Sequence, residues 1–412
     1  MELSKLKTVE SVDVSGKKVL VRVDFNVPLD EEGNVSDDTR LVAALPTINY
    51  LLEKGAKVIL MSHLGRPKGK VVEKLRMDGV ARRLEELLGK KVKKLNDCVG
   101  PAVEAAVAQM LPGEVVLLEN LRFHPEEEAN DRQFARALAS LGDIYVNDAF
   151  GTAHRAHAST AGVAEFLPAV AGFLMEKEVK ALGQLLVNPP RPFTVVLGGA
   201  KVKDKIGVLE NLLNKVDRFL FGGGIANTFL RVQGYDLGDS LIDEEHLSFA
   251  AEFLKKAQKS GVGVELPEDL VVTSGDNGEV KVVAPGEVPG GWKALDIGPR
   301  TAERYAELVR SSKTVFWNGP LGVFEKEEFR RGSEIVAKAI ASPGVTSIVG
   351  GGDTLALLEK VGVAGKVTHA STGGGASLEF LEGKQLPGVE ALMKGTGEEK
   401  SGVLGKETVG SR

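Results

Sequence analysis

Short apolar runs that end in glycine or a small polar residue recur along the second half of the chain. They cover residues 195–199, 219–224, 315–320, 348–353 and 372–375, with a weaker copy at 263–267. Continuous apolar runs between chain-breaking residues are typical of strands buried on both faces of a parallel sheet. Glycine at the end of such a strand lets backbone amides approach a ligand, and open α/β sheets bind ligands at the carboxyl ends of their strands. The pattern predicts a sheet edge that binds a polyanion such as a nucleotide.

The first half of the chain alternates apolar strands with helices in the same way. Strands are predicted at residues 18–27, 57–61, 115–118 and 144–146. Between them, Val80, Leu84 and Leu87 have a helical spacing that stops at Gly89, and Pro101 begins another helix. Strands that alternate with helices imply an α/β fold with two doubly wound, Rossmann-like domains, each built on a parallel sheet.

A single amphipathic helix is predicted between the two halves, over residues 173–187. The sequence Asn-Pro-Pro-Arg-Pro that follows cannot stay helical and ends it. We therefore expect a first domain at 1–171, an interdomain helix and hinge at 172–190, a second domain at 191–394 and a polar C-terminal tail at 395–412. Two strand patterns at 271–273 and 280–283 flank a glycine-containing turn and predict an antiparallel ribbon inserted in the second sheet.

Composition and charge narrow the class of protein. The chain has 412 residues, more than a single hydrophobic core usually holds, with 43% hydrophobic and 26% charged residues. Its net charge of −5 argues against wholesale binding to nucleic acid or membrane surfaces, so an anion site must be a local basic cluster. Cys98 is the only cysteine, which excludes an intrachain disulfide and a cysteine-rich zinc site. The charged start and the lack of a long apolar run predict a cytoplasmic protein without a membrane segment.

The first predicted strand carries polar residues at alternate positions. Apolar side chains occupy one face of residues 19–27, which leaves Arg22, Asp24 and Asn26 on the other. For Arg22 we favour an ordinary half-exposed strand position. Asp24 and Asn26 stand just before Pro28, where the strand must end, and we expect both in a binding site.

Basic residues follow further predicted strands or precede a helix in the first half. They are Arg40, His63, Arg66, Arg122 and Arg155. A single arginine at such a position is usually a solvated or salt-bridged surface group. Several at one sheet edge are different, because arginine binds phosphate and carboxylate through two parallel hydrogen bonds. In an acidic protein the cluster predicts a small anionic substrate.

In the second half, two lysines follow the first glycine-ended strand. Lys201 and Lys205 are four residues apart, which places them on one face of a predicted helix. Cations are unfavourable at the positive end of a helix unless a bound phosphate reverses the sign, so a phosphate site is indicated. Asp353, in the run Gly-Gly-Gly-Asp-Thr, is either a helix N-cap or a carboxylate that holds Mg²⁺ against nucleotide phosphates.

Three other functional classes compete with this interpretation. A Rossmann-type oxidoreductase requires a G-x-G-x-x-G fingerprint after the first strand of a domain, and none occurs; P-loop and protein-kinase signatures are absent as well. A non-catalytic nucleotide-binding module leaves the basic cluster of the first half unexplained. A kinase for another small molecule differs only in its substrate.

Taken together, the motifs resemble those of the phosphoglycerate kinase family from about residue 5 to about residue 390. The resemblance rests on residues 21–28, 38–40, 62–67, 198–202, 317–320, 350–354 and 371–376, in the family's order. It implies reversible phosphoryl transfer from 1,3-bisphosphoglycerate to MgADP, giving 3-phosphoglycerate and MgATP, by a protein that is usually a monomer. The sequence departs from the family pattern at Ala294, where a glycine is frequent, and at 75–78, which replaces a more usual Ser-Leu-Lys-Pro-like segment.

The resemblance also implies roles for individual residues. The phosphoglycerate would be held by Asp24, Asn26, Arg40, His63, Arg66, Arg122 and Arg155. The nucleotide would be held by Gly199, Ala200, Lys205, Asn318, Val323, Glu325, Gly351, Gly352, Asp353 and Thr354, with Glu325 on the ribose and Asp353 on Mg²⁺. The transferred phosphoryl group would be stabilised by Arg40, Lys201, Lys205 and the amides of Gly373, Gly374 and Gly375.

The implied reaction needs no catalytic base. Its nucleophile is a phosphate oxygen in one direction and a carboxylate with a pKa near ~4 in the other, and neither requires deprotonation at neutral pH. Catalysis would consist of positioning and charge stabilisation. Because the two substrates are assigned to different domains, closure about the hinge at 172–190 is expected to bring them in line and exclude water.

Overall fold

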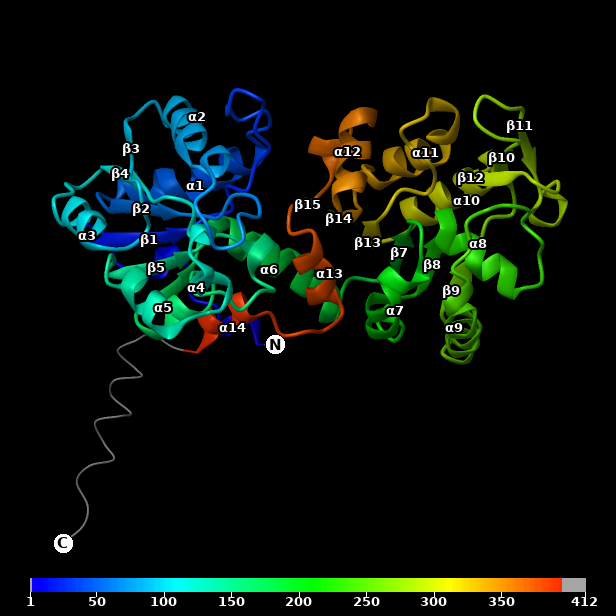
Figure 1. Cartoon of the computed structure of the whole chain (residues 1–412). Coiled ribbons are helices and arrows are strands. Elements are labelled where there is room, and N and C mark those ends of the chain that lie inside the picture. Colours follow the sequence, from blue (N-terminus) through cyan, green and yellow to red (C-terminus); the bar gives the residue numbers. More distant parts are fainter. Residues whose placement is uncertain (1, 395–412) are drawn as a thin grey trace, which may run out of the picture. The chain divides into compact units, whose positions relative to one another are not determined.

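The computed structural model of the chain describes residues 2–394, which fall into two compact units (Figure 1). The first unit comprises residues 2–180 together with 385–394, and the second comprises residues 181–384. The polar tail predicted at 395–412 lies outside the described residues. Among the helices of residues 2–394, none combines the length and the apolar character that a membrane crossing requires.

A parallel six-stranded sheet forms the centre of the first unit, in the order β3-β4-β2-β1-β5-β6. The strands are β1 (Lys18–Arg22), β2 (Lys57–Met61), β3 (Val92–Lys94), β4 (Val115–Leu117), β5 (Ile144–Asn147) and β6 (Ala169–Ala171). The helices are α1 (Thr39–Glu53), α2 (Asp78–Leu88), α3 (Pro101–Ala108), α4 (Pro125–Glu128), α5 (Arg132–Ala139) and α14 (Pro387–Met393). Every residue of β1 and β2 after the first is buried, as expected for strands that helices cover on both faces.

The helix signals of the first half are confirmed. Helix α2 ends where Gly89 adopts a left-handed conformation with φ of 62°, and α3 begins at Pro101.

The first strand is shorter than predicted, because β1 ends at Arg22 and residues 23–27 form a loop. The amide of Val23 still donates to the carbonyl of Met61 at 3.0 Å. The amide of Phe25, in contrast, donates to the hydroxyl of Ser62 at 2.9 Å. A side-chain acceptor therefore replaces the backbone ladder, and the loop turns away from the sheet before Pro28.

A second parallel six-stranded sheet, in the order β15-β14-β13-β7-β8-β9, forms the centre of the second unit. Its strands are β7 (Phe193–Leu197), β8 (Arg218–Phe221), β9 (Gly263–Glu265), β13 (Thr314–Asn318), β14 (Thr346–Gly350) and β15 (His369–Ser371). Its helices are α7 (Ile206–Leu212), α8 (Gly223–Val232), α9 (Leu247–Lys259), α10 (Pro299–Arg310), α11 (Arg331–Ile340), α12 (Gly352–Val361) and α13 (Gly375–Leu381). Five of the six runs contain a strand of this sheet, whereas residues 372–375 follow β15 and lead into α13. The predicted α/β fold is confirmed.

The predicted ribbon at 271–283 exists but is not inserted in that sheet. Strands β10 (Leu270–Thr273) and β11 (Val280–Val283) pair antiparallel as expected. Strand β12 (Lys293–Ile297) pairs with the other side of β10, which makes a separate three-stranded sheet (Figure 1). The small sheet has its own apolar cluster, with Leu230, Leu270 and Val272 buried in it. It can therefore bury a face without joining the larger sheet.

Helix α6 (Phe173–Leu186) follows β6 and ends one residue before the predicted end. At its start, the carboxylate of Asp148 accepts hydrogen bonds from the amides of Leu174 and Met175 at 3.0 and 3.2 Å. Burial raises the pKa of Asp148 to about 6, although the hydrogen bonds from Thr47 and these amides oppose the shift. The division between the two units falls within this helix, after Lys180.

Candidate active site

The carboxyl ends of β1, β2, β4 and β5 lie at one edge of the first unit's parallel sheet. The loops that follow them carry most of the predicted substrate residues: Asp24 and Asn26, then His63 and Arg66, then Arg122, then Arg155. Arg40 is the second residue of α1. Parallel pairing thus gathers segments from four distant parts of the chain at a single edge, as proteins of this architecture commonly do at ligand sites.

Arg22 is not half-exposed, as the sequence suggested, but fully buried. Its Nη2 lies 2.9 Å from Nδ1 of His63, its Nε donates to the hydroxyl of Ser159 at 2.8 Å, and its Nη1 donates to the carbonyl of Val23. Since arginine keeps all its protons, Nδ1 of His63 must be the acceptor, and the N–H of that ring is at Nε2. The expectation failed because helices cover both faces of the sheet, so alternate positions of β1 are all buried.

Glu127 completes this buried network. Its carboxylate accepts hydrogen bonds from the hydroxyl of Ser159 at 2.5 Å and from the amide of Ser159 at 2.7 Å. Glu127 is fully buried, so its charge and that of Arg22 are linked through one hydroxyl away from water. The network holds the His63 ring in one tautomer and orientation.

Arg40 is held by the two polar residues of the loop after β1. Its Nη1 donates to the carbonyl of Asn26 at 2.7 Å and lies 3.4 Å from a carboxylate oxygen of Asp24. The side-chain oxygen of Asn26 accepts from the amide of Gly65 at 2.9 Å, which ties the loops after β1 and β2 together. The side chain of Arg40 is 41% exposed, so its guanidinium is anchored at one nitrogen and open to a ligand.

Positive charge is concentrated where these loops meet. Burial, followed by the charges of Arg22 and Arg122, lowers the pKa of His63 well below its usual value. Burial and the same two arginines lower the pKa of His157 to about 4. Burial is also the main cause that lowers the pKa of Arg122, with Glu128 opposing it. Both histidines are therefore neutral at pH 7, and His63, whose Nδ1 already accepts from Arg22, has its Nε2–H left to donate to a ligand.

Two buried nitrogens of this cluster lack a hydrogen-bond partner, Nδ1 of His157 and Nε of Arg122, although the latter is in an ion pair with a carboxylate oxygen of Glu128 at 3.6 Å. Leaving a buried polar group unpaired costs roughly 1–3 kcal/mol. Unpaired nitrogens beside several arginines are the arrangement expected where an anion binds. Arg22 and His157 are the two residues of this cluster that the sequence did not assign to the site. His157 lies in the same histidine-containing segment as Arg155, and that proximity was the available signal.

Arg66 and Arg155 are both exposed. The charge of Arg155 contributes to the lowered pKa values of His157 and Arg122, so Arg155 lies near them. Arg66 follows His63 in the loop after β2. Beside that loop is an open cleft of about 650 Å³, lined by Asn26, Val27, Leu29, Asp30, Glu31, Gly33, Leu64, Gly65, Lys74 and Leu75. The basic residues do not line this cleft, so their access to solvent rests on the exposed side chains of Arg40, Arg66 and Arg155.

In the second unit, Lys205 is the charged residue at the centre of the predicted nucleotide site. It is buried, with 8% of its surface exposed, and its ammonium donates to the side-chain oxygen of Asn318 at the end of β13. Burial lowers the pKa of Lys205 to about 8, although Asp204 opposes the shift. A cation desolvated in this way gains from a polyanion placed against it.

Lys201 and Lys205 do not lie on one face of an α-helix. Residues Val202–Lys205 form a 3₁₀ turn, η7, which Lys201 precedes, and α7 begins only at Ile206. Lys201 is exposed whereas Lys205 is buried. The tighter turn has about three residues per turn, so a spacing of four no longer aligns two side chains. The buried Lys205 can therefore contact a phosphate held against the sheet edge, whereas the exposed Lys201 would have to reach a phosphate from solvent.

The loop between β14 and α12 meets Asn318 and the loop after β13. The side-chain amide of Asn318 donates to the carbonyl of Gly350 at 2.9 Å, and the hydroxyl of Thr354 accepts from the amide of Gly319 at 2.7 Å. Gly351 has a φ of 97°, and Gly352 and Asp353 form the exposed first turn of α12. Asp353 is thus not the residue that precedes the helix. Its carboxylate points to solvent beside free helical amides, where phosphate oxygens and a carboxylate could share Mg²⁺.

The glycines at the strand ends have two different roles. A Cβ on Gly198 would lie 2.0 Å from the carbonyl oxygen of Pro320, and one on Gly224 would lie 2.1 Å from that of Ala200. These glycines let neighbouring loops pack backbone to backbone. Gly352 and Gly374, in contrast, have no heavy atom within 4 Å of an added Cβ. Only the second kind leaves the backbone open to a ligand.

The remaining predicted residues of the second unit lie at the same sheet edge. Gly199 and Ala200 follow β7, where Gly199 has a φ of 113° and Ala200 is exposed. Val323 is partly buried and Glu325 is exposed in the loop after β13. Of the three glycines after β15, Gly373 is buried with its amide 3.3 Å from the hydroxyl of Ser371, whereas Gly374 and Gly375 are exposed. The exposed pair leads directly into α13.

Comparison with known proteins gives a consistent result. The family model described as phosphoglycerate kinase matches residues 9–384. A phosphoglycerate kinase of Moorella thermoacetica is 62% identical over 387 residues, which cover 93% of this chain and 98% of the relative. The structure of phosphoglycerate kinase from Coxiella burnetii has a TM-score of 0.88 at 43% identity and covers 94% of this chain and 99% of that one. The phosphoglycerate kinase structure from Pyrococcus horikoshii OT3 has a TM-score of 0.81 at 37% identity and covers 96% and 100%.

Proposed function

The chain belongs to the phosphoglycerate kinase family and has the activity of that enzyme, and from this premise we propose how its two units divide the reaction. The first unit binds 3-phosphoglycerate or 1,3-bisphosphoglycerate, and the second binds MgATP or MgADP. The observation that carries this division is the separation of two kinds of charge. In one unit several arginines lie near buried nitrogens of Arg122 and His157 that make no hydrogen bond, whereas in the other a single desolvated lysine lies at the sheet edge where α12 begins.

The phosphate and carboxylate of the phosphoglycerate are bound by the arginine cluster and its neutral histidine. Arg66, Arg122 and Arg155 supply charge, and Nε2 of His63 donates a hydrogen bond because Arg22 occupies Nδ1. Asp24 and Asn26 orient Arg40 and accept from the substrate hydroxyl, which a wholly cationic site could not do. These assignments favour a small molecule with two anionic groups over a nucleotide.

The nucleotide phosphates are bound by Lys205 and by the exposed amides at the start of α12, with Asn318, Gly351 and Thr354 fixing the loops. Glu325 accepts the ribose hydroxyls, and Gly199, Ala200 and Val323 line the nucleoside pocket. Mg²⁺ fits this site because Asp353 presents an exposed carboxylate next to phosphate-binding amides, the donor set that the ion prefers. When bound, the ion neutralises phosphate charge.

The transfer itself requires charge stabilisation and no proton removal. The phosphoryl group moves in line between a carboxylate oxygen of 3-phosphoglycerate and the terminal oxygen of ADP, and its equatorial oxygens carry the charge. Arg40 from the first unit, and Lys205, Lys201 and the amides of Gly374 and Gly375 from the second, are the groups proposed to receive it. The amide of Gly373, predicted to join this set, donates instead to the hydroxyl of Ser371 at 3.3 Å, and we propose that it fixes the turn that presents the other two amides.

Direct transfer requires that the two substrates meet, so we propose that the units close about the segment 172–190 during turnover. The functional domains are then 1–171, completed by α14 at Pro387–Met393, and 191–384, whereas the sequence pattern had carried the second domain to 394. The working form is a cytoplasmic monomer, because each unit supplies a complete set of groups for its own substrate.

Replacing Arg40 by alanine tests the assignment of the reacting group. Removing a donor that acts on developing charge costs about 10²–10³ in kcat. We expect a fall of that size in the Arg40→Ala variant, with a much smaller change in the Kd for 3-phosphoglycerate, measured by calorimetry. The matched variant Arg66→Ala should mainly raise KM, because Arg66 contributes to binding in the ground state. An unchanged kcat in Arg40→Ala would remove Arg40 from the catalytic set while leaving the family assignment intact.

A further inference from the structure

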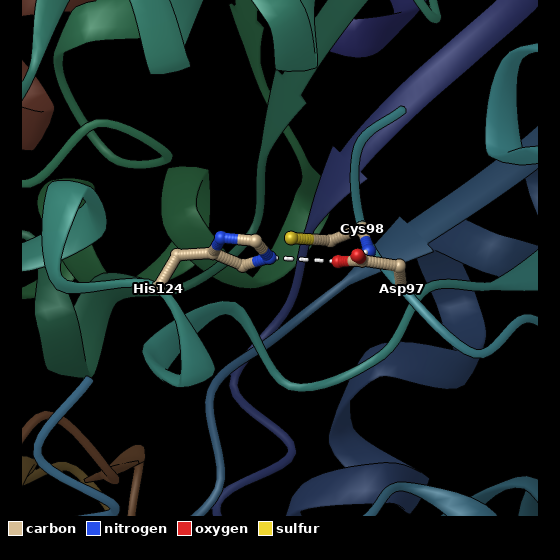
Figure 2. A group of neighbouring side chains, drawn as sticks. All are labelled: Asp97, Cys98 and His124. Atoms are coloured by element: carbon tan, nitrogen blue, oxygen red, sulfur yellow. Dashed lines mark hydrogen bonds and ion pairs between the residues drawn. The ribbon is translucent and has the colours of Figure 1, made fainter. Parts of the chain in front are cut away.

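Three side chains that the reaction does not use converge next to η4 (Leu121–Phe123), the short turn that carries Arg122. Asp97 and Cys98 belong to the loop between β3 and α3, and His124 precedes α4. Their ligand atoms, a carboxylate oxygen, the thiol sulfur and Nε2 of the imidazole, all lie within 4.8 Å of one another. Figure 2 shows the sulfur of Cys98 and the carboxylate of Asp97 both directed at the His124 ring.

We propose that Asp97, Cys98 and His124 form a binding site for a thiophilic divalent cation of the Zn²⁺ class. Thiolate, imidazole and carboxylate are the three ligand types that Zn²⁺ takes from proteins. Mg²⁺, which serves the nucleotide, prefers oxygen ligands and would discriminate against this set. Three protein ligands leave a fourth tetrahedral position for water, as in open zinc sites.

The exposure of the three residues suits entry of an ion from solvent. The side chains of Asp97 and His124 are 51% and 30% exposed, whereas Cys98 is fully buried and forms the floor of the site. Nε2 of His124 lies 2.7 Å from a carboxylate oxygen of Asp97. Ligands on a tetrahedral Zn²⁺ are roughly 3.3–3.8 Å apart, given bonds of about 2.0–2.3 Å, so the exposed Asp97 must rotate outward slightly.

The charge around the thiol also favours a cation. Burial is the main cause that raises the pKa of Cys98 well above its usual value, and the carboxylates of Asp97, Glu127 and Glu119 add to it. Lys94 and Arg76 neutralise Glu119 from its far side, at 2.5 and 3.2 Å, and Ser159 links Glu127 to Arg22. The remaining negative charge, on Asp97, faces the thiol and the imidazole.

The proton balance of binding is simple. The thiol loses its proton to solvent as the sulfur–metal bond forms. The imidazole of His124 gives up its hydrogen bond to Asp97, and Nε2 binds the ion once solvent exchange has removed the proton from that nitrogen. The thiolate of Cys98 and the carboxylate of Asp97 then neutralise the divalent cation.

Co²⁺ is a suitable spectroscopic substitute for Zn²⁺ in the full-length enzyme without nucleotide. Because Cys98 is the only cysteine, any sulfur-to-cobalt charge-transfer absorption in the near ultraviolet reports on this site alone. We expect that absorption, together with tetrahedral visible bands, at one Co²⁺ per chain, and both should disappear when Zn²⁺ displaces Co²⁺. Absence of the charge-transfer band at saturating Co²⁺ would overturn the proposal.

Substitutions then assign the ligands. Cys98→Ser should abolish the charge-transfer band, and the exposed Asp97→Asn, which leaves the interior intact, should weaken Zn²⁺ binding about tenfold or more. A matched control exists in the second unit, where Nδ1 of His246 lies 2.9 Å from a carboxylate oxygen of Asp243 without a cysteine nearby. His246→Ala should leave the band and the affinity unchanged. Equal losses in Asp97→Asn and His246→Ala would mean that Zn²⁺ binds elsewhere, and would refute the site.

Discussion

At the scale of single residues, burial changes what a charged side chain can do. Lys205 is the clearest case, because desolvation lowers its pKa from 10.5 to about 8. Arg22 shows the other outcome: a guanidinium keeps its charge in the interior and uses it to fix the neighbouring His63. The two cations therefore suit different tasks, one titratable beside the nucleotide and one permanent beside the phosphoglycerate.

The pH dependence of the reaction should report on Lys205. In the free enzyme the ammonium loses its proton as the pH rises through about 8, so kcat/KM for MgATP is expected to fall above that pH. Bound nucleotide phosphates stabilise the charged ammonium and raise its pKa. The fall in kcat, which reports on the enzyme–substrate complex, should therefore occur at a higher pH than the fall in kcat/KM.

The variant Lys205→Arg provides the control for this limb. Arginine remains protonated throughout the accessible range, so the fall above pH 8 should vanish even if the absolute rate is lower. Steady-state rates between pH 6.5 and 9.5 are sufficient. A limb that persists unchanged in Lys205→Arg would assign the titration to another group.

At the scale of elements, the loop between β14 and α12 shows why two adjacent glycines are not equivalent. Gly351 has a left-handed φ of 97°, and a Cβ there would lie 2.9 Å from the side-chain amide of Asn318. Gly352 begins the helix and has open space where a Cβ would project. The conformation of the loop requires glycine at 351. At 352 glycine is required only if a ligand approaches the backbone.

Alanine at each position separates these two requirements. Gly351→Ala should lower the free energy of unfolding of the ligand-free enzyme by about 1–2 kcal/mol, because an L-residue is strained in that conformation. Gly352→Ala should be neutral or stabilising by up to about 1 kcal/mol, since alanine favours the helix.

Nucleotide binding gives the second measurement for this pair. If phosphate oxygens approach the first turn of α12, Gly352→Ala should weaken MgADP binding although the fold is intact. Urea titrations and calorimetry measure the two effects independently. A Gly352→Ala variant that binds MgADP normally would move the phosphates away from this turn.

The elements themselves were largely predictable from the sequence, for a physical reason. Strands of a two-sided sheet must be continuously apolar, so runs such as 57–61 coincide with β2 residue for residue. The same burial explains the error at Arg22, because its partners Ser159 and His63 are distant in sequence. The 3₁₀ turn before α7 was missed because its hydrophobic spacing is also compatible with an α-helix.

The sequence could not show which glycines of the candidate site leave the backbone open to a ligand. Composition does not distinguish Gly198, which accommodates Pro320, from Gly352, which faces open space. That distinction depends on which loops meet at the sheet edge. The sequence could place the arginines near one sheet edge because each lies in a segment after a strand or at the start of a helix, and strand ends converge in a parallel sheet.

At the scale of the whole molecule, stability should depend on pH through a carboxyl group in the second unit. Asp296 in β12 is buried and accepts hydrogen bonds from the amides of Gly332 and Ile297 at 3.0 and 2.9 Å. Burial nevertheless raises its pKa from 3.8 to about 8. The folded state then binds a proton that the unfolded state has lost, so the free energy of unfolding should fall as the pH rises from about 4 to about 8.

The comparison of the wild type with Asp296→Asn isolates this contribution. The asparagine variant cannot titrate at this position, so its stability relative to the wild type should increase between pH 6.5 and 8, whereas the contributions of His63 and His157 are common to both proteins and cancel. Urea unfolding at several pH values measures the difference. A constant difference over this range would show that the carboxyl group is already ionised.

Helix α14 gives the chain an order of assembly. The amide of Gly388 donates to the carbonyl of Ala153 at 2.8 Å, and Val389 and Leu392 are buried. The first unit is therefore completed by a segment that begins at residue 385, more than two hundred residues after its main part ends at Lys180. On the ribosome the N-terminal segment emerges early yet lacks this last piece, whereas the second unit is one uninterrupted stretch. We expect the unit that begins synthesis to be the one that finishes folding last, so that a nascent chain acquires its nucleotide site before its phosphoglycerate site is complete.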